Sequence, residues 1–183
     1  MRARPRTLDR LLEAGFRLRP GELRPTLLMF LGCLATVGAF IAGRSVRDTL
    51  FLTRLSSREL PQMYGWSSLA VALSGALFAR LAARHRPERL LPWTGAAFAL
   101  SVLLARAALG TGTWIVYALY VWVEVLGAVT VIQFWSLANE AYDAREARRL
   151  FALIGAGGTL ANVVVGFAVR DLAGRLGAEN LLF

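Results

Sequence analysis

The stretch YALYVWVEVLGAVTVIQFWSLANEAYDAREARRLFALIGAGG, residues 117–158, decides the fold. It places one carboxylate, Glu124, about halfway along an apolar run of bilayer length. It then continues through Trp135 and Asn139 into a basic turn and a second, glycine-rich apolar run. A lone acid at the centre of a bilayer costs roughly 2.5–3.5 kcal/mol on insertion scales. We therefore expect Glu124 to face a substrate, an ion or a buried partner.

The composition indicates a membrane protein. Of 183 residues, 56% are hydrophobic and 18% are charged, whereas about a quarter of the residues in an ordinary soluble domain are charged. The net charge is +9, and all 21 cations are arginine. Nucleic-acid-binding proteins are also basic, but these arginines lie at the ends of apolar runs, where they orient membrane helices. We therefore expect a lipid bilayer, and no nucleic acid, as partner.

The apolar runs predict an all-α membrane protein with five complete spans and the beginning of a sixth. A helix needs about 20 residues to cross roughly 30 Å of hydrocarbon. A basic, partly amphipathic tail over residues 1–25 is expected either in the headgroup layer or in solvent. The transmembrane bundle should cover residues 26–183, with spans at about 26–55, 61–83, 91–109, 113–138 and 150–169 and a sixth starting near 180.

The distribution of arginines predicts the orientation. The tail and the connections after the second and fourth spans carry 14 arginines, whereas the opposite side carries 7. Because cytoplasmic loops hold the excess of positive charge, we expect the amino terminus in the cytoplasm. The connections are short, so the helices should form a compact bundle.

Charged residues interrupt the first span at Arg44, Arg47 and Asp48, which share one side of a helix. Either the helix continues through them and this side faces protein or water, or they end the helix at the headgroups. A guanidinium forks onto phosphate or carboxylate through two parallel hydrogen bonds, which suits anion binding. Alternatively, Arg47 forms a structural pair with Asp48 or Glu124. The candidate partners of Glu124 are Arg47, Arg44 and Arg106.

One face of the fourth span combines aromatic, acidic and small side chains. At 100° per residue, the members of this face lie within about 60° of Glu124. This pattern suits a water-filled cavity in which a planar ring stacks, although the aromatic residues alone are more typical of interface anchors and packing. The face comprises Tyr117, Tyr120, Glu124, Gly127, Ala128, Val131 and Trp135.

Two local motifs in residues 143–166 predict structure rather than chemistry. Asp143 and Glu146 have the spacing of a capping box at the start of a helix. The run Gly155-Ala-Gly157-Gly158, followed by Ala161, Asn162 and Gly166, favours close helix packing, because small residues four apart let helices approach each other. It does not complete a phosphate loop or a dinucleotide fingerprint.

Catalytic and metal-binding patterns are absent from the sequence. One cysteine, Cys33, and one histidine exclude an intrachain disulfide and the usual zinc clusters. No nucleophile or acid–base set accompanies them. We expect no enzyme, no cofactor and no metal.

Two stretches resemble the ATP/ADP translocase family, the nucleotide transporters of plastids and intracellular bacteria, which is related to the major facilitator fold. They are YVWVEVLGAVTVIQFWSLANEAYDAREARRLFALIGAGG and, earlier in the chain, GRSVRDTLFLTRL. The resemblance implies that Arg44, Arg47 and Asp48 correspond to the family's first-span Arg-Asp-Thr-Lys-Asp cluster. Arg47 then takes the place of a functional lysine, and Glu124 that of a functional fourth-span acid. Ser45 and Val46 depart from the family's Asp-Thr.

The resemblance implies the amino-terminal half of a facilitator-type transporter in a bacterial inner membrane, exchanging nucleotides such as ATP and ADP, or another phosphorylated anion, by alternating access. The missing carboxy-terminal half of the same chain would then be a partner. The predicted substrate-binding residues are Arg44, Arg47, Asp48, Tyr120, Glu124 and Asn139. Two alternatives are a non-transporting membrane anchor or sensor derived from a transporter, and a transporter of a non-nucleotide anion.

Overall fold

The computed structural model describes residue 19 and residues 21–82, 87–108 and 112–176, and this part of the chain is helical without strands. The all-α fold class is thereby confirmed. The expected cytoplasmic tail falls largely, and the expected sixth span entirely, outside the described residues. The helices are α2 (Leu23–Arg54), the short 3-10 helix η1 (Ser57–Glu59), α3 (Leu60–Ala82), α4 (Pro87–Ala108), α5 (Trp114–Ala141) and α6 (Ala144–Leu176).

Four stretches of the described chain are long and apolar enough to cross a membrane: Leu23–Arg54, Ser57–Ala82, Trp114–Ala141 and Ala144–Ala168. In hydrocarbon, a helix satisfies its backbone polar groups internally, and apolar sequences of this length can therefore cross as helices. Helix α4, which covers most of the expected third span, is not among the four, and its crossing stays a prediction.

Helix α2 continues without a break through the charged residues at 44–48. The first of the two sequence interpretations is thus correct: these side chains are part of a membrane helix rather than its end. Arg47 is buried against protein, as a helix crossing lipid requires of a charged side chain.

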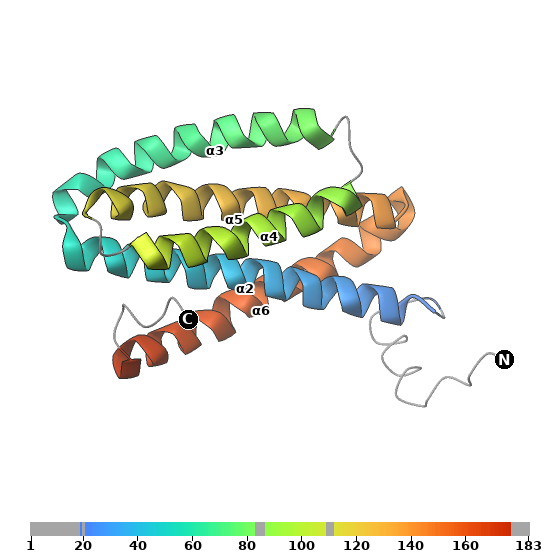
Figure 1. Ribbon diagram of the computed structural model, residues 1–183. Coiled ribbons are helices and arrows are strands. Elements are labelled where there is room, and N and C mark those ends of the chain that lie inside the picture. The colour runs from blue at the N-terminus through green and yellow to red at the C-terminus, as the bar shows by residue number, and fades with distance from the viewer. Residues whose placement is uncertain (1–18, 20, 83–86, 109–111, 177–183) are drawn as a thin grey trace.

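Helix α5 is central to the bundle and packs against α2, α3 and α4. Figure 1 shows α2, α3, α4 and α5 running roughly alongside one another, with α6 crossing α2 obliquely. Helix α2 is therefore held between two neighbours, α5 on one side and α6 on another.

The contact between α2 and α6 depends on small residues in α6. A Cβ atom on Gly157 would lie 2.5 Å from the backbone oxygen of Phe30, and one on Gly158 would lie 3.5 Å from Cys33 Sγ. Asn162 donates to the Gly158 carbonyl at 2.9 Å within α6. The glycine run therefore lets the two backbones approach, as the sequence pattern predicts.

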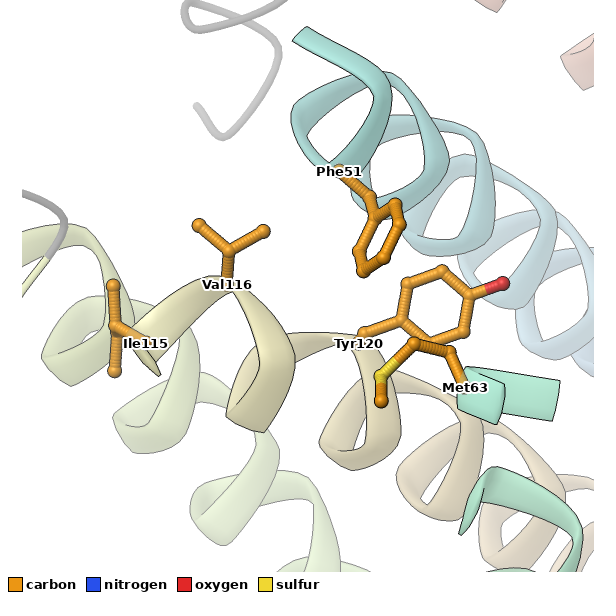
Figure 2. Packing of buried hydrophobic residues seen from close by; sticks show 5 residues of the cluster. All are labelled: Phe51, Met63, Ile115, Val116 and Tyr120. Carbon is orange, nitrogen blue, oxygen red and sulfur yellow. The ribbon is translucent and has the colours of Figure 1, made fainter. Parts of the chain in front are cut away.

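At the opposite end of α2, a cluster of buried side chains joins α2, α3 and α5. It consists of Phe51, Met63, Ile115, Val116 and Tyr120 (Figure 2). The Phe51 and Tyr120 rings meet edge-on, with centroids 5.0 Å apart. This apolar cluster lies beside the charged residues of α2, since Phe51 follows Arg47 by one helical turn.

Helix α6 begins at a complete capping box. Asp143 Oδ1 accepts the backbone N–H groups of Arg145 and Glu146, each at 2.8 Å, and Glu146 Oε2 accepts the Asp143 N–H at 3.1 Å. The predicted capping box is confirmed. The two backbone donors stabilise the ionised carboxylate, so they lower the pKa of Asp143 below its ordinary value.

We expect Asp143→Ala to lower the unfolding temperature at pH 7, because two helix-start N–H groups lose their acceptor. Asp143→Asn should be close to wild type there, since an amide oxygen also caps. A carboxyl with a lowered folded pKa stabilises the protein above its unfolded pKa, about 3.9, and loses this effect as the pH falls through the folded value. Unfolding temperatures measured from pH 6 to 3 should therefore fall more steeply for wild type than for Asp143→Asn. If the curves of unfolding temperature against pH are parallel for the two proteins, the Asp143 carboxylate does not stabilise the start of α6 through its charge.

Candidate functional site

Glu124 on α5 forms ion pairs with two arginines of α2, Arg44 and Arg47. Arg44 Nη2 lies 2.8 Å from Glu124 Oε1, and Arg47 Nη1 donates to the other oxygen, Oε2. Arg44 and Arg47 are three residues apart on one face of α2, so both can reach the same side chain on the neighbouring helix. Of the three candidate partners of Glu124, the structure places Arg44 and Arg47 against it.

Arg47 is enclosed on several sides. Its side chain is 2% exposed, and its Nε and Nη2 atoms each lie 3.0 Å from Asp48 Oδ1. Nη1 also donates to the Tyr120 backbone oxygen at 3.3 Å, while the guanidinium carbon lies 4.0 Å from the centre of the Tyr120 ring. Each of the three guanidinium nitrogens therefore has an acceptor, and one face of the group is covered by an aromatic ring.

Arg44 is in a different environment. Its side chain is 49% exposed, and its guanidinium carbon lies 5.5 Å from the centre of the Phe40 ring, one turn earlier on α2. Phe40 in turn lies against Gly127 of α5, where a Cβ atom would overlap the ring. The absence of a side chain at Gly127 thus makes room for the ring that lies under Arg44.

Asp48 completes the ion-pair cluster, which we define as Arg44, Arg47, Asp48 and Glu124. Its side chain is 40% exposed, whereas that of Glu124 is 17% exposed. Two guanidinium groups face two carboxylates, and their formal charges cancel. Such a cluster between α2 and α5 keeps the buried Arg47 compensated, which a charge in an apolar surrounding requires.

The two remaining predicted substrate-binding residues are placed differently. Tyr120 is fully buried, with its ring against Arg47 and Phe51, so in this conformation it packs rather than faces an open cavity (Figure 2). Asn139 is exposed, and its position fifteen residues after Glu124 puts it about 22 Å further along α5. The structure therefore brings together Arg44, Arg47, Asp48, Tyr120 and Glu124 but not Asn139.

The aromatic face of α5 is mostly packed against neighbouring helices. Trp135 meets Phe151 of α6, with ring centroids 5.5 Å apart, and Tyr117 donates to Glu59 of η1. A groove of about 480 Å³ lies between α3 and α5, lined by apolar side chains and Tyr117. None of the predicted substrate-binding residues lines this groove. In this conformation, the aromatic residues of α5 thus act mainly as packing groups, which is one of the two interpretations of the sequence pattern.

Phe40 is a neighbour of the ion-pair cluster that sequence reasoning missed. The available signal was its position one turn before Arg44, together with a glycine one turn after Glu124 on the facing helix. Across the described residues, no group of three or more His, Cys, Asp and Glu side chains could hold a metal ion.

Comparison with known proteins connects the second half of the chain to a family. No curated protein and no solved structure matches the chain. The sequence model of the TLC ATP/ADP transporter family matches residues 104–180. This range contains Glu124 and all of α5, whereas Arg44 and Arg47 lie before it. The described part of the chain is thus helical and includes four candidate membrane-spanning helices, and residues 104–180 match the TLC ATP/ADP transporter family, as the resemblance predicts.

Proposed function

We propose that the chain is the amino-terminal half of a secondary-active transporter that exchanges nucleotides or another phosphorylated anion. The observation that carries the proposal is the ion-pair cluster between α2 and α5, in which Arg44 is half exposed beside Glu124. The family match over residues 104–180 supports the substrate class.

The chemistry of the cluster suits an oxyanion. A guanidinium offers two parallel N–H donors that match two phosphate oxygens, and such charge-assisted hydrogen bonds are about twice as strong as neutral ones. Transporter sites usually lie at the interface between two repeats, so these residues would supply one wall of the site. The opposite wall would come from the carboxy-terminal half.

Alternating access would require α2 and α5 to change their relation to the opposite half while the buried Arg47 stays compensated. The cluster supports this, because its charges cancel and no group needs an external counter-ion in the empty state. The proposal includes an amino terminus in the cytoplasm, which the arginine distribution supports, and a bacterial inner membrane as the location, which the family resemblance implies.

The test is exchange of labelled ADP for internal ATP in vesicles containing the full-length protein. We expect Arg47→Ala and Glu124→Gln each to lower the exchange rate about tenfold or more, since each breaks an ion pair of the cluster. Glu140→Gln is the matched control, because this exposed carboxylate lies on the same helix outside the cluster.

The outcomes separate the candidate functions. Exchange of inorganic phosphate or pyrophosphate without exchange of nucleotides would indicate a non-nucleotide anion as cargo. An absence of exchange for every anion by a correctly folded protein would favour the membrane anchor, in which the ion-pair cluster only holds α2 against α5. Exchange that is unchanged in both variants would remove the site assignment.

A further inference from the structure

We infer that the two arginines of the cluster have different roles: Arg44 contacts the transported anion, Arg47 positions Glu124, and the anion displaces Glu124 from Arg44. This inference rests on the proposed function and assigns roles within the same site. The sequence pattern treats the two arginines alike, and the family resemblance gives prominence to Arg47. The structure separates them by burial and by the number of groups that each one contacts.

Arg47 is poorly placed to bind an incoming anion. Its three nitrogens already face Asp48, Glu124 and a backbone oxygen, and its exposed fraction is 2%. An anion could reach it only after these contacts break, and the Glu124 carboxylate, which is 17% exposed, would then depend on Arg44 alone for compensation. Arg47 is therefore a positioning residue, which fixes the Glu124 carboxylate.

Arg44 can exchange its partner at low cost. Its guanidinium has one carboxylate contact, Glu124 Oε1 at 2.8 Å, and is 49% exposed. An ion pair at this exposure contributes little to stability, because solvent screens it and both side chains lose rotational freedom. A phosphate group, which accepts two donors at once and carries more charge than a carboxylate, is a stronger partner for the same guanidinium.

Glu124 is suited to give up Arg44 because its two oxygens have separate partners. Oε1 contacts Arg44, while Oε2 contacts Arg47. When an anion takes Arg44, the Glu124 carboxylate stays compensated by Arg47 and is not left as an unpaired charge in an apolar surrounding. In the empty protein, Glu124 thus occupies the anion position on Arg44 and competes with the substrate.

The inference predicts opposite effects of two neutralising substitutions. We would measure binding of pyrophosphate and of ADP to the full-length protein in detergent by titration calorimetry. Arg44→Gln should weaken binding of both about ten- to a hundredfold, as expected for the loss of a charged hydrogen-bond donor, with an unchanged unfolding temperature. Arg44→Lys should recover part of the affinity, because an ammonium keeps the charge and loses the fork. Glu124→Gln should strengthen pyrophosphate binding about two- to fivefold, since the internal competitor is removed.

A double substitution tests the role of Arg47. In Arg47→Gln, Glu124 can turn both oxygens to Arg44, so pyrophosphate binding should weaken about tenfold. Adding Glu124→Gln should restore binding to near the wild-type value. If Arg47 contacted the anion directly, the double variant would bind as weakly as Arg47→Gln. Glu140→Gln again serves as the control that should change nothing.

The results distinguish this inference from the proposed function. If Arg44→Gln leaves the affinity for pyrophosphate at the wild-type value, or if Glu124→Gln lowers that affinity, the inference is overturned. The proposed transport function then still stands. Pyrophosphate binding that requires Arg44, without any nucleotide exchange in vesicles, supports the inference and overturns the nucleotide function. If the unmodified protein binds neither probe, both are overturned.

Discussion

Gly157→Leu is expected to separate α6 from α2. The glycine lies where even a Cβ atom would come within 2.5 Å of the Phe30 backbone oxygen. A backbone atom cannot move aside as the tip of a side chain can, so the helices themselves must shift. Overpacking usually costs about 1–3 kcal/mol, and we expect this substitution at or above the upper end of that range.

The single cysteine provides the measurement. Cys33 is 2% exposed and lies beside Gly158 in the same interface, so a thiol reagent should label it slowly in the wild type. Labelling should become at least tenfold faster in Gly157→Leu, and the unfolding temperature should fall. Gly166→Ala is the matched control on the same helix, because a Cβ there meets nothing within 4 Å. Equal labelling rates in Gly157→Leu and Gly166→Ala would refute the proposed contact.

Arg47→Gln is expected to be the most destabilising change in the ion-pair cluster. Breaking a buried pair by removing one partner typically costs about 3–5 kcal/mol, because the other charge stays buried. We expect a loss near 3 kcal/mol in the free energy of unfolding, the lower end of this range. Glu124 keeps Arg44 as a partner, and Asp48 is 40% exposed and can be solvated.

Unfolding by sodium dodecyl sulphate, followed by circular dichroism, would measure this loss. Glu124→Gln added to Arg47→Gln should recover a large part of the stability, since the uncompensated carboxylate is then neutral. Arg44→Gln is the control, because the same substitution at a half-exposed arginine should change the free energy by less than about 1 kcal/mol. Equal losses for the two arginines would show that burial does not distinguish them.

These two predictions concern the two sides of α2. On one side, glycines bring α6 against the backbone of α2, and on the other, charges join α2 to α5. The first contact depends on shape and the second on electrostatic compensation. We therefore expect the effects of Gly157→Leu and Arg47→Gln to be nearly additive, because the two sites share no partner.

The aromatic residues of α5 show what a sequence pattern cannot predict. Tyr120 and Glu124 share a helical face, and this periodicity is visible in the sequence. Whether such a face lines a cavity or packs against a neighbour depends on what lies opposite. In this structure, Phe51 and Arg47 of α2 lie opposite Tyr120 and bury it.

The sequence by itself determined the all-helical membrane class, the capping box at Asp143 and Glu146, and the packing role of the glycine run. These features depend on local spacing and hydropathy, which the linear chain records directly. Only the tertiary structure decided which arginine is buried and which is exposed, since Arg44 and Arg47 have the same chemistry and lie on the same helical face. That difference arises from the position of α5 against α2, which places Tyr120 over Arg47 and leaves Arg44 half open beside Glu124.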